Sequence, residues 1–553
     1  MQSGYTGHVT PSEWRWVIWV GCVLIVFAFI PFLWVILGGV AGTRWEFFGA
    51  LHDYQNGASD LAKVFQGSQG YLISRYLQTP EAQPGTLFDF IYVLIGQLSR
   101  FTFIPGVILF HIARVAASLF MYLALYHLAA CVWMRVRTRR IFFLLVVGGA
   151  GFGWLLAPIT NDPSYLDLTA PEVFPFYATL VNVHYPLAIG CLALVASIII
   201  PVFRPGMSNE AGVQNEALIL FVMGLLLSFL YPQALPALML SFLLLIGVRW
   251  YTRKALIPRD GWWLTWFIVP TLPMLVYYGA LLAYRPVIAE IWAQQNSVSA
   301  PPIPILVASL GVPLLIALPG IWRAVRYFEP DGDQFMLIWL FMMVFLAYFT
   351  PSIQRRFLIG LMIPLTYFAT RALEDFWFHL VNRRWRLRLF AAMLPVIAAS
   401  LIFVLFLPTF PILSDSLNKA SGMLLESDYT QAFRWLRQRG ASGEIVLAAP
   451  NTSTWIPATT GLRVVYGHPT DTLQPDIKRM QLIAWYNADD LENCDDLLQG
   501  DYTFSNGYMV RYVLIGPQER ALGTTVCDTM LEPLETFGDV ELYLYTPPII
   551  SIP

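Results

Sequence analysis

Long apolar runs fill the first 412 residues, whereas residues 413–553 alternate short apolar runs with polar stretches. The hydrocarbon core of a bilayer is about 30 Å thick and needs roughly 20 apolar residues per helix. The runs therefore predict about eleven membrane helices, the weakest being two pairs joined by short polar breaks. The predicted spans are 15–41, 102–134, 141–158, 184–203, 217–232, 233–248, 262–284, 303–322, 335–350, 357–373 and 389–412.

The segment 413–553 has a different pattern. An amphipathic helix is predicted over Tyr429–Gln438, ended by Gly440 at a position that favours a left-handed residue. Four runs rich in β-formers follow, at 444–448, 464–466, 512–515 and 540–545. A helix followed by such runs with Gly and Pro breaks is typical of a small α/β domain. The predicted fold class is thus an all-α polytopic membrane bundle over 1–412 with a C-terminal α/β domain over 413–553.

Composition and charge support this division. Of 553 residues, 57% are hydrophobic and 13% are charged, about half the charge of an ordinary soluble domain. This excludes a disordered chain, a disulfide scaffold and a compact cytosolic enzyme. Residues 1–412 carry a net charge of +7, and residues 413–553 carry −9. We expect the lipid bilayer as a partner and no nucleic acid.

Loop charges predict the orientation, because cytoplasmic loops collect Lys and Arg. Basic residues fall in alternate loops at 135–140, 249–259, 323–326 and 383–388, and the loops 159–183 and 286–302 contain none. We therefore expect a multi-pass protein of the cytoplasmic membrane with its N-terminus inside and its C-terminal domain outside. Cys494 and Cys527 both lie in that domain, in a compartment that permits disulfides. A bridge between them is predicted, and two unrelated thiols remain the alternative.

The first outside loop, 43–101, is long and concentrates ionisable residues. Loops of this length are usually functional, and interfacial helices are predicted over 57–66 and 87–98. Asp53 and Asp60 are candidates for a general base towards an acceptor hydroxyl. Glu81 is a candidate for binding substrate. Solvated surface is the alternative role for these acids.

Two further loops offer candidate residues. Glu172 and His184 could join the site from the second outside loop. Arg355 and Arg356 lie in a short outside connection, where two guanidinium groups suit a phosphate. The alternatives are a hydrogen bond at a helix start for His184 and contact with lipid headgroups for the arginines.

These features together resemble the GT-C superfamily of polytopic membrane glycosyltransferases, which includes the protein mannosyltransferases and aminoarabinose transferases. The resemblance spans roughly 15–412 and is nearest to a group of uncharacterised bacterial membrane proteins. It implies an acidic catalytic residue in the first outside loop and positive charge in a late loop for a polyprenyl-phosphate sugar donor. The residues that carry it are Asp60-Leu61-Ala62-Lys63, Gln66-Gly67, Gly70, Thr79-Pro80-Glu81-Ala82-Gln83, Gly151-Phe152-Gly153-Trp154, Pro171-Glu172 and Asn182-Val183-His184-Tyr185. The stretch Val465–Thr472 resembles the outside domain of that group.

The chain departs from that pattern at two positions. The acid of the group falls on Asn56, and its histidine falls on Gln83. An amide cannot act as a carboxylate base, so Asp53 or Asp60 would have to take this role. A divalent metal could bridge the acids and the phosphate, although no ligand spacing in the sequence requires one.

Three functions follow as hypotheses. The first is transfer of a sugar from a polyprenyl-phosphate donor to an outside acceptor. The second is a non-catalytic membrane scaffold with the same architecture, whose C-terminal domain binds a protein partner. The third is a transporter, which would be indicated by interrupted spans in two related halves, and the sequence shows no such symmetry.

Overall fold

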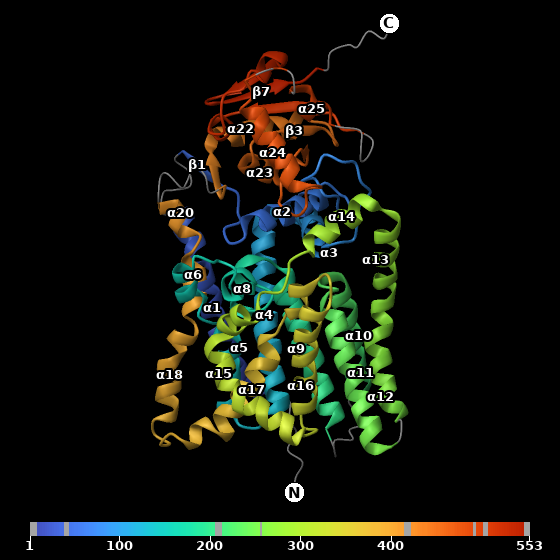
Figure 1. Ribbon diagram of the computed structural model, residues 1–553, viewed down its shortest axis with the longest axis vertical. Coiled ribbons are helices and arrows are strands. Elements are labelled where there is room, and N and C mark those ends of the chain that lie inside the picture. Colours follow the sequence, from blue (N-terminus) through green and yellow to red (C-terminus); the bar gives the residue numbers. More distant parts are fainter. Residues whose placement is uncertain are drawn as a thin grey trace. The chain divides into compact units, whose positions relative to one another are not determined.

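The computed structural model describes residues 8–37, 44–204, 213–254, 257–413, 422–489, 491, 494–500 and 507–546 (Figure 1). It divides into two compact units. The helical unit comprises Met1–Phe29, Ile112–Ala280 and Asn296–Leu407. The mixed unit comprises Ile30–His111, Leu281–Gln295 and Pro408–Pro553. The predicted boundary at 412/413 lies close to the start of the last of these segments.

Most of the described residues are helical. Eight helices within the described part of the chain are long and apolar enough to cross a membrane, and two shorter apolar helices cover Asn215–Leu230 and Asp333–Phe349. The predicted span 357–373 corresponds to the 14-residue helix α17 (Met362–Asp375). The predicted class, a polytopic α-helical membrane protein, is therefore confirmed.

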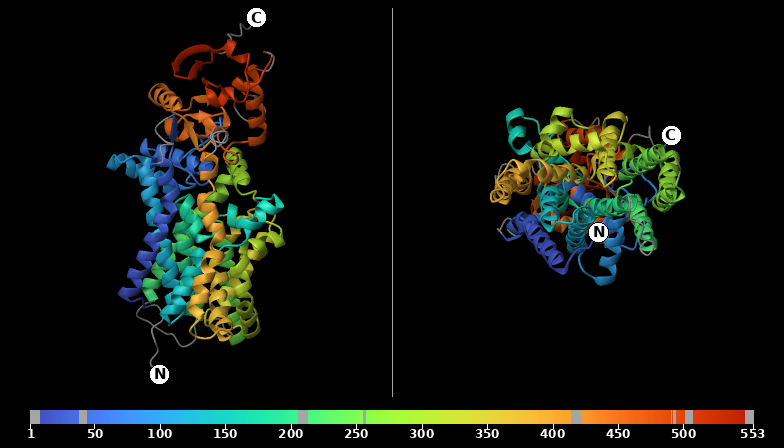
Figure 2. Two further views of the ribbon diagram at one scale, coloured as in Figure 1. Left: turned by 90° about the vertical axis from the view of Figure 1, so that its left-hand side faces the viewer. Right: turned by 90° about the horizontal axis from the view of Figure 1, so that it is seen from below.

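Helices of the main spans follow the apolar runs closely. They are α1 (Pro11–Leu37), α4 (Gly106–Val132), α5 (Val136–Gly148), α6 (Gly153–Thr160), α9 (His184–Phe203), α10 (Val213–Leu230), α11 (Ala234–Arg253), α12 (Pro258–Ile268), α13 (Leu272–Tyr284), α15 (Ile303–Tyr327), α16 (Asp333–Phe349), α18 (Arg386–Ile397) and α19 (Ala399–Phe406). In the helical unit, α10 packs against α9 and α12 (Figures 1 and 2).

Small residues let two of these helices approach closely. A Cβ atom on Gly320 of α15 would lie 2.3 Å from the backbone oxygen of Phe368 in α17. No real side chain tolerates that distance, so glycine allows this contact between the backbones. Such small-residue contacts are a main source of helix association in membranes.

The mixed unit is built from three separate stretches of chain. The first stretch supplies β1 (Trp45–Phe47), α2 (Tyr54–Ser68) and α3 (Phe90–Thr102), and the second supplies α14 (Pro286–Gln295). The C-terminal stretch supplies β2 (Leu424–Glu426), which pairs antiparallel with β1 in the register Trp45 to Glu426. The segment 43–101 and the C-terminal segment therefore share a sheet.

The C-terminal stretch also forms a five-stranded sheet in the order β4-β3-β5-β7-β6. Its strands are β3 (Ile445–Leu447), β4 (Arg463–Val464), β5 (Tyr512–Ile515), β6 (Glu532–Phe537) and β7 (Val540–Leu544). β3 pairs parallel with β4 and β5, and β7 pairs antiparallel with β5 and β6. The accompanying helices are α22 (Ser427–Arg439), α23 (Pro450–Thr460), α24 (Pro475–Tyr486), α25 (Cys494–Gln499) and α26 (Pro517–Arg520). The predicted α/β fold of this segment is confirmed.

Three local features differ from the predictions. Gly440 has φ −69°, so the prediction of a left-handed residue there is wrong. A Cβ atom at this position would lie 2.7 Å from the backbone oxygen of Leu436, so lack of space is what favours glycine. The sequence pattern does not predict strand β6, because its residues are mostly exposed and include Pro533. Helix α14 lies in the stretch 286–302, which the sequence indicates only as a loop.

A disulfide joins Cys494 and Cys527, whose Cα atoms are 5.6 Å apart. Both residues belong to a buried apolar cluster that includes Trp485, Leu498 and Val513. The bridge thus ties α25 to the segment that precedes β6.

Candidate functional site

The helical unit brings Arg355 and Arg356 together with Glu172. The arginines lie in a short 3-10 helix, η2 (Gln354–Leu358), between α16 and α17. Glu172 lies between α7 (Leu166–Thr169) and α8 (Pro175–Val181). Nε of Arg355 donates to Oε1 of Glu172 at 3.2 Å, and Nη1 of Arg356 is 3.9 Å from the same oxygen. The backbone of Gly360 donates to the Glu172 carbonyl at 2.9 Å, which fixes the position of the acid.

Two tyrosines complete this arginine cluster. Nη1 of Arg356 donates to the hydroxyl of Tyr185 at 2.8 Å. The ring of His184 is 4.2 Å from that of Tyr185 and stacks on Tyr231 at 6.4 Å between centroids. The predicted residues Glu172, His184, Arg355 and Arg356 therefore lie together. The sequence does not single out either tyrosine as a site residue, although Tyr185 belongs to the stretch Asn182–Tyr185 that carries part of the family resemblance.

The charges of the cluster suit an anion. Glu172 is fully buried, whereas the side chains of Arg355 and Arg356 are 18% and 20% exposed. One carboxylate faces two guanidinium groups, which leaves an excess of positive charge that solvent or a ligand can reach. Oε2 of Glu172 has no hydrogen-bond partner among the described residues. Paired guanidinium groups bind phosphate with charge-assisted hydrogen bonds.

In the mixed unit, the two candidate bases differ in exposure. Asp53 precedes α2 in a left-handed conformation, with φ 50°, and its carboxylate is exposed. It accepts a hydrogen bond of 2.8 Å from Nδ2 of Asn56. Asp60 lies two turns further along α2, is only 4% exposed, and has one carboxylate oxygen 3.6 Å from Nζ of Lys63. A substrate could therefore reach Asp53 without any movement of the protein, but not Asp60.

Lys63 connects two acids in the interior of the mixed unit. Its Nζ is 2.5 Å from Oδ2 of Asp89 and also faces Asp60. Burial opposes the charge of Lys63, but Asp89 and Asp60 outweigh it and raise the pKa of this amine. Burial and the nearby Asp89 raise the pKa of Asp60 well above its usual range, against the influence of Lys63. Asp60 therefore belongs to a buried polar group around Lys63.

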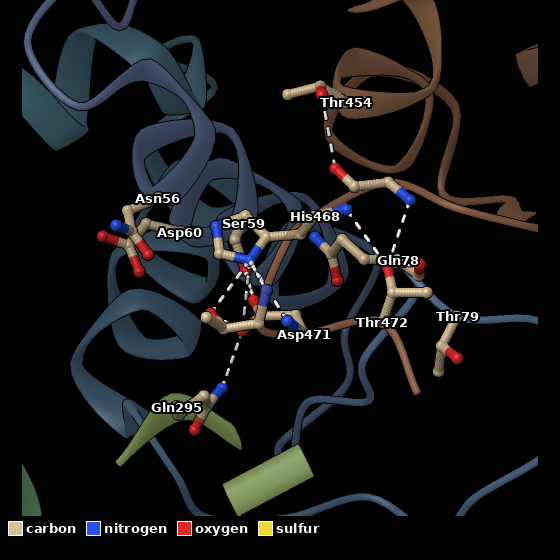
Figure 3. A network of polar contacts seen from close by, with 12 residues as sticks. Asn56, Ser59, Asp60, Gln78, Thr79, Gln295, Thr454, His468, Asp471 and Thr472 are labelled. Carbon is tan, nitrogen blue, oxygen red and sulfur yellow. Dashed lines mark hydrogen bonds and ion pairs between the residues drawn. The ribbon is translucent and has the colours of Figure 1, made fainter. Parts of the chain in front are cut away.

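A loop of the C-terminal segment, Tyr466–Thr472, lies beside Ser59 of α2 (Figure 3). Asp471 accepts hydrogen bonds from Ser59 of α2 and, at 2.8 Å, from Gln295 of α14. Burial works against the charge of Asp471, but His468, Lys63 and these hydrogen bonds lower its pKa below the ordinary value. The stretch Val465–Thr472 thus joins all three parts of the mixed unit.

Backbone contacts hold the same loop in place. Gly467 donates to the carbonyl of Gln78 at 3.1 Å, and the hydroxyl of Thr472 donates to it at 2.7 Å. Nδ1 of His468 accepts from the backbone N–H of Thr470 and Asp471, both at 3.1 Å. These contacts stabilise a fixed loop conformation around Asp471.

Glu81, the other acidic candidate of the segment 43–101, is held in an ion pair. Its carboxylate is buried, accepts a hydrogen bond from Thr79, and forms an ion pair with Lys478 of α24. Gln83, at the position of the family's histidine, donates to the carbonyl of Tyr76 at 2.7 Å. Both side chains are thus engaged within the mixed unit, which gives Glu81 a structural contact.

One group of acids in the described residues has ligand atoms close enough to hold a metal: Glu329, Asp331 and Asp333. Two arginines already neutralise this group, since Arg323 lies 2.7 Å from Glu329 and Arg371 lies 3.1 Å from Asp333. An arginine-rich ion network disfavours a cation there. These acids therefore fit a structural role better than a metal site.

The described architecture is similar to the fold of solved membrane proteins, in agreement with the fold that the sequence resemblance implies. Among solved structures, the oligosaccharyltransferase of Archaeoglobus fulgidus, solved with Zn and sulfate, has a TM-score of 0.51 and 11% identity, covering 97% of this chain and 74% of that one. ArnT from Cupriavidus metallidurans, bound to undecaprenyl phosphate, has a TM-score of 0.54 and 13% identity, covering 97% of this chain and 99% of that one. No protein-family model and no curated protein matches the sequence. At these identities the likeness concerns the fold.

Proposed function

We propose that the protein transfers a sugar from a polyprenyl-phosphate donor to an acceptor hydroxyl outside the cytoplasmic membrane. The arginine cluster of the helical unit binds the donor phosphate. Asp53 of the mixed unit takes the proton of the acceptor.

The arginine cluster is the observation that carries the proposal. Its two guanidinium groups are partly exposed, and Glu172 orients them while neutralising only one positive charge. A leaving phosphate develops negative charge as the glycosidic bond breaks, and fixed guanidinium groups stabilise that charge. The structural likeness to ArnT, solved with undecaprenyl phosphate, supports a donor linked to a lipid phosphate.

Exposure favours Asp53 over Asp60 as the base. In an inverting transfer the acceptor oxygen attacks the anomeric carbon, the bond from that carbon to the phosphate oxygen breaks, and the acceptor proton moves to the carboxylate. A base must come within hydrogen-bond reach of that proton. Asp53 meets this need because its carboxylate is exposed, whereas Asp60 is buried beside Lys63.

A membrane scaffold without activity is the second candidate. It is favoured by Asn56, which is exposed where the related group has its acid and which donates to Asp53. In that case the C-terminal domain would bind a protein partner, and Asp53 would only anchor the start of α2.

Donor binding and turnover separate these functions. Purified protein in bilayer nanodiscs is given a panel of radiolabelled polyprenyl-phosphate sugars, with and without EDTA to test for a divalent metal. Arg356→Gln should weaken donor binding about 10- to 100-fold, since a hydrogen bond to a charged group contributes about 1.5–3 kcal/mol. Asp53→Asn should lower turnover about 10²- to 10⁴-fold with binding unchanged.

Matched controls are available in the helical unit. Arg326→Gln changes an exposed charge and Asp162→Asn a half-buried one; neither residue belongs to the arginine cluster, so both variants should leave both measurements unchanged. Donor binding unchanged by Arg356→Gln would refute the phosphate site. Donor binding without turnover in the unmodified protein, across the panel, would favour the scaffold.

A further inference from the structure

A groove of about 680 Å³ lies within the mixed unit, and its lining includes neither the arginine cluster nor Asp53. Its walls come from β1, α2, the end of α3, α22 and α23. Apolar side chains make up most of the lining, and five of them are aromatic: Phe47, Phe48, Phe65, Phe103 and Trp455. Sites of 300–1,000 Å³ with apolar walls and few polar groups are typical for small apolar ligands.

One cation stands at this groove. The guanidinium carbon of Arg437, on α22, is 5.1 Å from the centroid of the Phe65 ring. Arg437 is exposed and forms no ion pair with a carboxylate of the described residues. None of the lining residues is acidic. The groove therefore combines apolar walls with one positive charge that a ligand can neutralise.

The rim of the groove is continuous with a membrane span. Phe103, at the end of α3, and Gly106, the first residue of α4, both line it. α4 is one of the helices long and apolar enough to cross a membrane. Phe101 and Phe103 are 75% and 91% exposed. Exposed Phe side chains on a short helix beside a span are typical of a helix that lies in the membrane interface.

Phe103 is also held in an unusual conformation. Its φ is 60°, in the left-handed region that large residues rarely adopt. The hydroxyl of Ser99 donates to the carbonyl of Ile104 at 2.6 Å and so closes this turn. The turn keeps the Phe103 side chain at the rim instead of continuing α3.

We propose that this groove binds an acyl chain of an anionic phospholipid from the surrounding bilayer, with the headgroup phosphate at Arg437. The apolar walls exclude a free phosphate as the main occupant, and the continuity with α4 gives a lipid direct access. The single unpaired cation selects an anionic headgroup over a zwitterionic one. The bound lipid would fix α3 and the start of α4 at the interface, independently of sugar transfer.

Photo-cross-linking tests this site. Protein in nanodiscs is irradiated with phosphatidylglycerol that carries a diazirine in its acyl chain, and the adducts are mapped by mass spectrometry. We expect adducts on peptides that contain Phe65, Phe103 or Trp455. Arg437→Gln should reduce these adducts about five-fold, because each Lys or Arg near an anionic surface contributes about 1 kcal/mol.

The chain offers a matched control on the same helix. Arg439 is exposed in the last turn of α22 and stacks on Trp435 at 5.0 Å, not on a groove residue. Arg439→Gln should therefore leave the adducts unchanged. Ala458→Trp places a large side chain in the groove and should abolish the adducts, while its unfolding midpoint shows whether the fold persists.

Several outcomes would overturn the assignment. They are an absence of adducts at the groove, equal losses in Arg437→Gln and Arg439→Gln, and equal labelling by a phosphatidylcholine analogue. Labelling of the groove by a photoactivatable polyprenyl phosphate that phosphatidylglycerol fails to displace would assign it to the donor tail instead.

Discussion

The ion pair between Glu81 and Lys478 allows a direct test of a structural against a substrate-binding role. Both residues are buried, at 8% and 7% exposure, and they join the segment 43–101 to α24. Lys478 also donates to the hydroxyl of Thr79 at 3.4 Å, and Thr79 in turn donates to Glu81. We predict that Glu81→Gln destabilises the mixed unit and leaves donor binding intact.

The size of the effect follows from burial. Removing one partner of a buried ion pair costs about 3–5 kcal/mol, because the other charge remains without compensation. The Glu81→Gln variant would still offer an amide oxygen to Lys478, so we expect a cost at the lower end of that range, about 3 kcal/mol. Lys478→Met alone should cost a similar amount. The double variant should cost at least about 1 kcal/mol less than the sum of the two, because it removes both charges together.

Urea unfolding in detergent, followed by pulse proteolysis of the C-terminal segment, measures these free energies. Glu444→Gln is a suitable control, since Glu444 forms an ion pair with Arg511 at 3.8 Å on the surface and its loss should cost less than about 1 kcal/mol. Additive costs of the two single variants, or a loss of donor binding in folded Glu81→Gln protein, would refute the structural role.

Three further predictions concern other contacts. Asp471→Asn should destabilise the protein by about 2–3 kcal/mol at pH 7. Because the pKa of Asp471 is lowered in the folded protein, this cost should shrink as the pH falls below about 4. A cost that does not change with pH would contradict a charged Asp471. Arg371→Met should cost about 3–5 kcal/mol in the same unfolding assay, because Asp333 is buried and would lose its partner charge. If Mg²⁺ stabilised the unmodified protein, that would instead indicate a metal ion bound by Asp333 and its neighbouring acids. Cys494→Ser should lower the free energy of unfolding by about 3–4 kcal/mol, because the lost disulfide closes a loop of 33 residues. Dithiothreitol should lower the stability of the unmodified protein by the same amount and leave the variant unchanged.

Local patterns predicted much of the fold. The apolar runs located the membrane helices, and amphipathic spacing located α22 within two residues of its observed bounds. Strands β3, β5 and β7 coincide with predicted runs because their residues are β-formers with a buried face. β6 escaped prediction because it lies at the sheet edge with exposed residues, where no hydrophobic pattern is needed.

The candidate site was predictable as residue types but not as contacts. Glu172 and Arg355 are 183 residues apart in the chain, and no periodic pattern links two loops at that distance. The sequence also could not separate Asp53 from Asp60, because their difference is burial beside Lys63. The stretch Val465–Thr472 had no assigned role until its contacts with Ser59 and Gln295 were visible.

The hydrogen bond between Ser59 and Asp471 joins residues that are 412 positions apart. At about 5–20 residues per second, ribosomal synthesis of this interval takes roughly 20–80 s. Throughout that time the nascent α2 carries Asp60 and Lys63 without the loop that later buries them. The mixed unit can therefore complete its folding only after every intervening span has been synthesised. A chain truncated by an early stop codon would leave these side chains exposed to membrane proteases.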